Sequence, residues 1–201
     1  MSQVKKAAKI LNSGGIVIFP TETVYGIGCL INKEDSIKKL YSIKKRDSTK
    51  PTAVLVKDLQ QAEEWVSFNT TAKKLAEAFW PGHLTLCLPV CKQVSESIVG
   101  PGDTLGVRVS SHPFILQLQR ELNVPLLAPS ANFQGKQEAR TFAEIDKQLL
   151  SLVDYVVGIE PEAKKPSTIL AFEKEKYNLL REGEISSAQI EQALRYVRSQ
   201  R

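Results

Sequence analysis

The chain has 201 residues, of which 42% are hydrophobic and 24% are charged, and its net charge is +5 with a pI near 9.0. This composition supports a sizeable core, excludes a disordered chain and favours a single domain. No apolar run is long enough to span a bilayer, and residues 1–9 lack an apolar signal core, so we expect a cytoplasmic protein. The basic balance favours an anionic partner such as a nucleotide, a nucleic acid or an acidic membrane.

The predicted elements alternate between helices and strands. In chain order we expect a helix over 4–11, a strand over 16–19, a helix around 37–41, a strand over 53–56, a helix over 72–79 capped by Thr70, and strands over 84–88 and 105–109. A helix over 114–122, a strand over 125–128, a helix over 141–150, strands over 153–157, 168–172 and 177–180, and a helix from 186 to 197 follow. This alternation predicts an α/β fold with a mixed sheet covered by helices, without repeats or a linker.

Cysteine and glycine patterns argue against several common sites. The three cysteines are an odd, sparse set, which is typical of a reducing compartment rather than of a disulfide framework. Cys87 and Cys91 are four residues apart, but no further Cys or nearby His completes a metal site, so we expect no protein-bound metal. The chain has no P-loop motif, and Gly26-x-Gly28 lacks the third glycine of a dinucleotide-binding loop.

The run from Ile16 to Gly28 is the strongest functional signal. An apolar strand ends at Pro20, which lacks an N–H, and Thr-Glu-Thr and two glycines follow it. Hydroxyls and small residues at a strand end suit close approach of the backbone to a ligand, and the basic triplet 44–46 supplies charge for an anion. The alternative interpretation is a polar turn together with a solvated, basic helix end.

Polar groups also follow or interrupt other predicted strands. Ser130 and Asn132, Ser167 and Thr168, and Arg181 lie at strand ends. A second cation, Arg108, interrupts an apolar strand, where it is either a solvent-facing edge residue or a fork for a carboxylate or phosphate. One charge-assisted hydrogen bond contributes roughly 1.5–3 kcal/mol, whereas micromolar binding needs about 8 kcal/mol. Several cations must therefore act together to hold a triphosphate.

Taken together, these segments resemble the YrdC/TsaC family of threonylcarbamoyl-AMP synthases from about residue 5 to residue 190. The resemblance rests on Phe-Pro-Thr-Glu-Thr-Val-Tyr-Gly-Ile-Gly at 19–28, Lys-x-Arg at 44–46, Lys-Pro at 50–51, Trp-Pro-Gly at 80–82, Gly-Val-Arg-Val at 106–109, Ala-Pro-Ser-Ala-Asn at 128–132, Ser-Thr at 167–168 and Arg-x-Gly at 181–183. It implies one YrdC-like domain over 1–201, in the short form without a C-terminal extension domain. The implied fold is an open, twisted mixed sheet with flanking helices and a concave, positively lined cavity.

The resemblance also implies an activity. Family members join L-threonine, bicarbonate or CO2, and ATP into threonylcarbamoyl-AMP and pyrophosphate, and other proteins use this product to modify tRNA. Mg²⁺ would arrive with ATP, and weak tRNA binding is left open. An RNA-binding module, or a regulatory paralogue on the same fold without adenylate synthesis, is the alternative interpretation.

Site residues follow from the resemblance position by position. Lys44 and Arg46 would be the catalytic basic pair at the phosphates. The implied threonine-binding residues are Thr21, Thr23, Arg108 and Ser167, and the implied ATP-binding residues are Lys44, Arg46, Lys50, Thr104, Ser130, Asn132 and Arg181. No general base is identified, although Glu22 is the nearest candidate.

Three positions depart from the family pattern. Ser110 replaces a common proline, Ala171 replaces a common aspartate, and Glu138 replaces an expected hydroxyl contact to ATP. Leu55 lies where some members have a polar contact to substrate, so that contact would come from the backbone or be absent.

Overall fold

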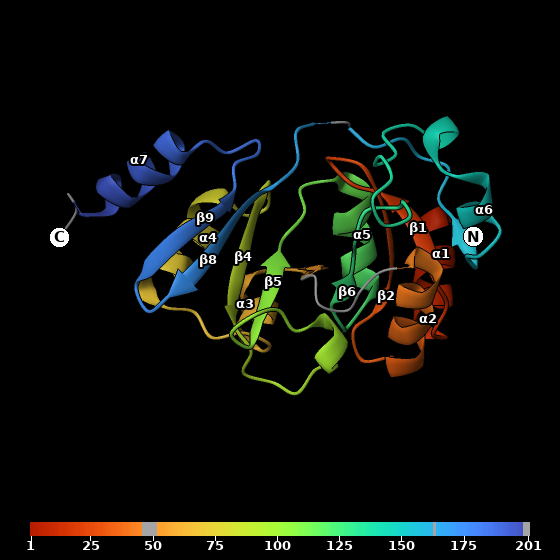
Figure 1. Cartoon of the computed structure of the whole chain (residues 1–201), viewed down its shortest axis with the longest axis horizontal. Coiled ribbons are helices and arrows are strands. Elements are labelled where there is room, and N and C mark those ends of the chain that lie inside the picture. Colours follow the sequence, from red (N-terminus) through yellow and green to blue (C-terminus); the bar gives the residue numbers. More distant parts are fainter. Residues whose placement is uncertain (46–51, 163, 199–201) are drawn as a thin grey trace.

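The computed structural model of the chain describes residues 1–45, 52–162 and 164–198, which form an open, twisted, nine-stranded sheet (Figure 1). Its strand order is β7-β1-β2-β6-β3-β5-β4-β8-β9. The pairs β1/β7, β3/β5 and β4/β8 are parallel, and the other neighbouring pairs are antiparallel. The strands are β1 (Val17–Pro20), β2 (Tyr25–Leu30), β3 (Ala53–Leu55), β4 (Leu84–Pro89), β5 (Thr104–Arg108), β6 (Leu126–Leu127), β7 (Tyr155–Val156), β8 (Thr168–Glu173) and β9 (Lys176–Arg181).

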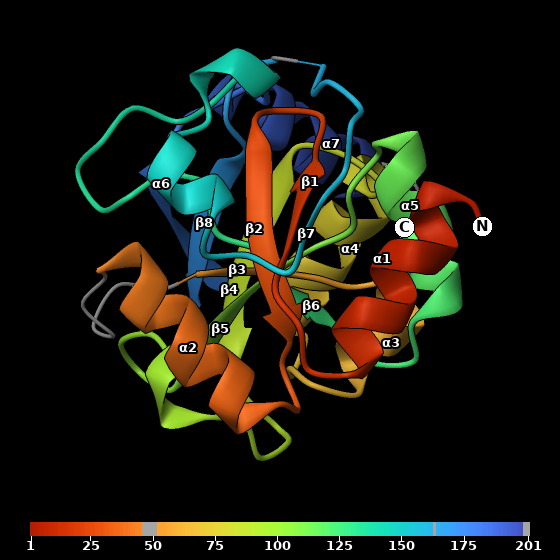
Figure 2. The same cartoon turned by 90° about the vertical axis from the view of Figure 1, so that its right-hand side faces the viewer.

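Helices cover this sheet on both faces. They are α1 (Gln3–Asn12), α2 (Glu34–Lys44), α3 (Leu59–Glu63), α4 (Thr70–Phe79), α5 (Pro113–Glu121), α6 (Lys147–Leu150) and α7 (Ser187–Arg198), with single 3₁₀ turns η1 (Glu96–Ile98) and η2 (Phe142–Glu144). Figure 2 shows α1 and α5 beside one another on one side of β1 and β2, with α2 on the other side. No helix of the described residues has both the length and the apolar character needed to cross a bilayer.

Two buried apolar clusters follow from the alternation of side chains along each strand. Along β1, Ile18 belongs to the larger cluster, which also contains side chains of α2, α4 and α7. Its neighbours Val17 and Phe19 belong to a second cluster formed with α1 and α5. Because both faces of β1 are covered, its sequence is a continuous apolar run rather than an alternating one.

Most of the predicted elements are present within a few residues of their expected bounds. Strand β2 was not predicted, because two glycines in its Tyr-Gly-Ile-Gly-Cys-Leu sequence weaken the strand signal. Helix α3 was not predicted either. The expected cap of α4 was wrong: Asn69, not Thr70, accepts the hydrogen bond from the Ala72 N–H.

The predicted helix over 141–150 is also wrong. The chain instead forms η2 and the short helix α6. The two are separated at Ile145, whose backbone is extended and whose side chain is buried in the larger cluster. Asp146 then starts α6 by accepting a hydrogen bond from the Gln148 N–H.

Candidate active site

A cavity of about 440 Å³ lies where the β1–β2 turn and strands β3, β4 and β5 meet the start of β8 and the end of β9. Strand alternation explains its floor, because Leu84, Leu86 and Val107 enter the core while the intervening residues face the cavity. The residues lining it are Thr21, Thr23, Val24, Gly26, Thr52, Ala53, Leu55, Thr85, Cys87, Gly106, Arg108, Ala128, Pro129, Ser130, Glu138, Pro166, Ser167, Ile169, Leu180 and Arg181.

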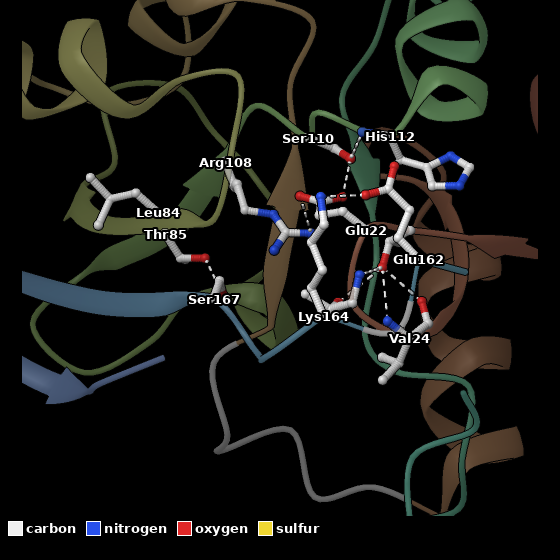
Figure 3. Close-up of polar contacts among 12 residues, drawn as sticks. Glu22, Val24, Leu84, Thr85, Arg108, Ser110, His112, Glu162, Lys164 and Ser167 are labelled. Carbon is white, nitrogen blue, oxygen red and sulfur yellow. Dashed lines mark hydrogen bonds and ion pairs between the residues drawn. The ribbon is translucent and has the colours of Figure 1, made fainter. Parts of the chain in front are cut away.

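One wall of the cavity is organised by Arg181 at the end of β9. Its Nε donates to the Ser167 carbonyl at 3.0 Å, and its Nη2 donates to Ser167 Oγ at 3.2 Å. The Ser167 hydroxyl also shares a hydrogen bond with Thr85 Oγ1 at 3.0 Å (Figure 3). Burial lowers the pKa of Arg181, and the nearby Glu138 carboxylate opposes that shift. Arg181 therefore brings a cation and an ordered hydroxyl to the same wall.

Arg108 lies on the cavity floor and is only 6% exposed, so the solvent-facing alternative does not hold. Its Nη2 lies 3.3 Å from Glu22 Oε1, and the other oxygen of Glu22 accepts a hydrogen bond from Ser110 Oγ at 2.5 Å (Figure 3). Burial lowers the pKa of Arg108, while the Glu22 charge opposes this shift and Arg181 adds to it. Glu22 is fully buried and is not among the lining residues, so the structure does not favour it as a general base.

The turn between β1 and β2 is closed by its own hydroxyls. Thr21 Oγ1 donates to the Val24 carbonyl at 2.7 Å and accepts hydrogen bonds from the Thr23 and Val24 N–H groups. The Thr21 and Thr23 hydroxyls lie 3.0 Å apart. Both threonines line the cavity, and their predicted contact with L-threonine stays a prediction, but the Thr21 hydroxyl also holds the turn in shape.

Lys44 lies behind the cavity wall rather than on it. The residue is buried at the end of α2, and its Nζ donates to the carbonyls of Ser130 and Asn132 at 2.5 and 2.6 Å. Ser130 lines the cavity, and its hydroxyl donates to Asn132 Oδ1 at 2.7 Å. Lys44 thus supports the loop that presents Ser130, so the solvated-helix interpretation does not hold for this residue.

Two other predicted site residues, Thr104 and Asn132, are not on the cavity wall. Thr104 begins β5, where its hydroxyl donates to the Pro101 carbonyl, and neither Thr104 nor Asn132 is a lining residue. Arg46 and Lys50 fall outside the described residues, so their roles at the phosphates stay predictions.

Comparison with known proteins places this architecture in a family. Residues 9–183 match the Sua5/YciO/YrdC family model, whose description reads "Telomere recombination". The chain belongs to the Sua5/YciO/YrdC family.

Relatives within this family carry a named activity. A Bacillus subtilis threonylcarbamoyl-AMP synthase is 37% identical over 94% of this chain and 56% of its own length. The Vibrio vulnificus threonylcarbamoyl-AMP synthase is 34% identical over 91% of this chain and 100% of its own length. A crystal structure of P. abyssi Sua5 complexed with L-threonine superposes with a TM-score of 0.88 and 31% identity, covering 95% of this chain and 57% of that chain. The chain thus spans little more than half of two of these relatives and the whole of the third.

Some cavity residues of this Sua5/YciO/YrdC chain were not identified from the sequence. Thr85 and Cys87 alternate with three buried leucines in β4, so the period of two was the available signal. Burial raises the pKa of the Cys87 thiol to about 11, which keeps it protonated and unreactive near neutral pH. The described residues contain no group of three or more His, Cys, Asp or Glu side chains that could hold a metal ion.

Proposed function

We propose that the chain is a threonylcarbamoyl-AMP synthase that uses L-threonine, bicarbonate or CO2, and ATP. The threonine ammonium loses a proton, the resulting amine adds to CO2, and loss of a second proton from nitrogen gives the carbamate. A carbamate oxygen then attacks the α-phosphorus of ATP, the bond to the β-phosphate oxygen breaks, and pyrophosphate leaves. This sequence needs no covalent enzyme nucleophile, in keeping with a cavity whose one cysteine, Cys87, is held as a thiol.

One observation carries the proposal: a single cavity brings together a buried guanidinium, a second guanidinium and several hydroxyls from distant segments. Arg108 suits the carboxylate of an amino acid because a guanidinium binds a carboxylate through two parallel hydrogen bonds. Arg181 suits an anionic phosphate, and Ser130 adds a hydroxyl. The threonine-bound P. abyssi Sua5 supports the same assignment through its likeness to this chain.

In this mechanism the residues act by placement and by stabilising charge. Arg181 would stabilise the charge that develops on the phosphate oxygens. The family resemblance assigns the same role to Lys44 and Arg46. Mg²⁺ would be bound mainly by the triphosphate, as is common for this ion, and would neutralise phosphate charge when present. Walls formed by Leu55, Ile169 and Leu180 would limit water near the labile carbamate and adenylate.

The product would pass to proteins that modify tRNA, and we retain the cytoplasm as the expected location. These two statements rest on the family resemblance and on the reactivity of an adenylate, which must be consumed by an acceptor.

The direct test is pyrophosphate release from ATP with each amino acid in turn, with and without bicarbonate. We expect release that requires threonine and increases with bicarbonate. Salt-sensitive RNA binding without ATP turnover would favour the RNA-binding alternative. A chain that binds ATP and threonine but releases no pyrophosphate would be a regulatory paralogue.

The variant Arg108→Lys tests in the same assay whether Arg108 binds the threonine carboxylate. Arg108→Lys keeps the positive charge beside Glu22 but removes the planar fork. We expect the KM for threonine to rise by about 10-fold or more, the loss of roughly one charge-assisted hydrogen bond, with the KM for ATP nearly unchanged. If the KM for ATP rises instead while threonine dependence survives, Arg108 belongs to the nucleotide site.

A further inference from the structure

Glu22 is a charged side chain buried beneath the cavity floor. It is 0% exposed: Oε2 accepts a hydrogen bond from Ser110 Oγ, whereas Oε1 forms an ion pair with Arg108 Nη2 at 3.3 Å and has no hydrogen-bond partner among the described residues (Figure 3). A carboxylate without such partners would be strongly disfavoured in this environment. The burial of Glu22 therefore makes sense only together with Arg108 and Ser110.

The Arg108 guanidinium has only part of its donors engaged by the protein. One nitrogen faces Glu22, whereas Nε is buried and lacks a hydrogen-bond partner among the described residues. Nε itself is shielded from the cavity, but Arg108 lines the cavity, so its guanidinium can bind an acceptor from outside the chain through its other nitrogens. Glu22 leaves the rest of the fork available while reducing the cost of burying its charge.

Glu22 is itself held from several directions, so it can hold Arg108 in turn. Its carbonyl accepts from the Lys164 N–H at 3.1 Å, and the neighbouring Thr21 carbonyl accepts from the Glu162 N–H at 3.2 Å. The Ser110 hydroxyl accepts from the His112 N–H at 3.2 Å, which directs its own proton to Glu22. His112 thus orients the carboxylate through Ser110, and Glu162 and Lys164 hold the backbone from which the Glu22 side chain projects.

We propose that Glu22, oriented by Ser110, is a positioning residue that fixes the Arg108 fork for the substrate carboxylate. This inference rests on the proposed function and adds to it a determinant of amino-acid recognition. Glu22 does not touch substrate, because it does not line the cavity. It acts through the direction and the charge of Arg108, and Ser110 gives this chain an additional anchor for it.

The test compares Glu22→Gln and Ser110→Ala with the wild-type chain, using threonine and threoninol, which lacks the carboxylate. In Glu22→Gln we expect kcat/KM for threonine to fall by about 10- to 100-fold, the range of one charge-assisted hydrogen bond, while the KM for ATP changes less than about twofold. The kcat/KM for threoninol should fall little, so the ratio of kcat/KM for threonine to that for threoninol should decrease. Ser110→Ala should show the same pattern with a smaller loss. A role confined to folding would reduce both substrates equally.

Asp154→Asn is the matched control. Like Glu22, this carboxylate accepts a hydrogen bond, from Ile16 N at 2.7 Å, and pairs with a cation, Lys39, but it lies away from the cavity lining. It should leave the preference for threonine unchanged. An unchanged or lowered KM for threonine in Glu22→Gln overturns the proposal. If Glu22→Gln does not fold, Ser110→Ala decides, and an unchanged preference in that variant overturns the proposal. Absence of threonine-dependent pyrophosphate release in the wild-type chain would instead reject the proposed function.

Discussion

Lys44 shows how a residue expected at the phosphates can have a second task. Its Nζ donates to the carbonyls of Ser130 and Asn132, so the ammonium connects α2 to the loop that presents a cavity hydroxyl. Lys44→Met keeps most of the stem and removes these donors. Since two half-buried carbonyls lose a charged partner, we expect the free energy of unfolding to fall by about 2 kcal/mol and the KM for ATP to rise. Urea unfolding and steady-state kinetics measure the two effects. Unchanged stability with a raised KM for ATP would leave Lys44 with the phosphate role alone.

Glu138 brings a negative charge to a cavity that we expect to hold a triphosphate. It lines the wall near Arg181, where it opposes the downward pKa shift of that guanidinium. Removing the charge should lower the KM for ATP, because charge repulsion at about 4 Å costs roughly 1 kcal/mol in water and more in a cavity. We therefore expect Glu138→Ser to lower the KM for ATP by about three- to tenfold, measured at constant Mg²⁺. A matched Glu160→Ser change, outside the cavity lining, should not alter it. A higher KM for ATP in Glu138→Ser would instead assign the carboxylate a direct contact.

The sequence predicted individual residues better than their partners. Arg108 was identified because a cation inside an apolar strand needs a polar surface or an ionic partner. In the structure that partner is Glu22. The Ser110–Glu22 hydrogen bond joins residues 88 positions apart, so no local pattern could indicate it. The sequence also could not show that the Thr21 hydroxyl closes the turn as well as lining the cavity. A threonine in either role looks the same in a sequence.

At the level of elements, the two glycines of β2 have different tasks, although the sequence suggested one shared task at a ligand. Gly26 lines the cavity, whereas a Cβ on Gly28 would lie 2.0 Å from the Leu127 carbonyl oxygen of β6. Gly28 therefore permits close pairing of two strands. The strand β6 was predicted, but no local pattern indicated that it pairs with β2.

A substitution pair tests this difference. Gly28→Ala forces β2 and β6 apart, so we expect the free energy of unfolding to fall by about 2–4 kcal/mol, as for other strained or overpacked positions. Gly106→Ala is the control, because its Cβ would meet Thr85 Cγ2 at 3.5 Å, an ordinary contact. That variant should change stability by less than about 1 kcal/mol. Equal losses in chemical denaturation would show that the Leu127 contact is not the cause.

For the whole molecule, the cavity exists only because the sheet order brings distant segments together. Strand β6 lies between β2 and β3, and β8 lies beside β4, so the turns and strand ends that carry the hydroxyls and both cavity arginines meet at one place. The alternation of elements predicted an α/β fold, but it did not specify this order. The order depends on nonlocal pairing, which a single sequence does not reveal without its family resemblance.

A shared cavity predicts coupled stabilisation by ligands. A ligand at about 100 times its Kd adds about 2.7 kcal/mol to the free energy of unfolding, which corresponds to roughly 5–10 °C in Tm for a chain of this size. We expect ATP with Mg²⁺, or a nonhydrolysable analogue, to give such a shift, and threonine to bind more tightly once the nucleotide occupies the adjoining wall. Thermal unfolding with each ligand alone and with both together measures the coupling. In Arg108→Lys the nucleotide shift should persist and the threonine shift should shrink, because we expect these ligands to contact different residues of one cavity. Strictly independent shifts, unchanged by that variant, would mean that threonine and ATP do not meet there.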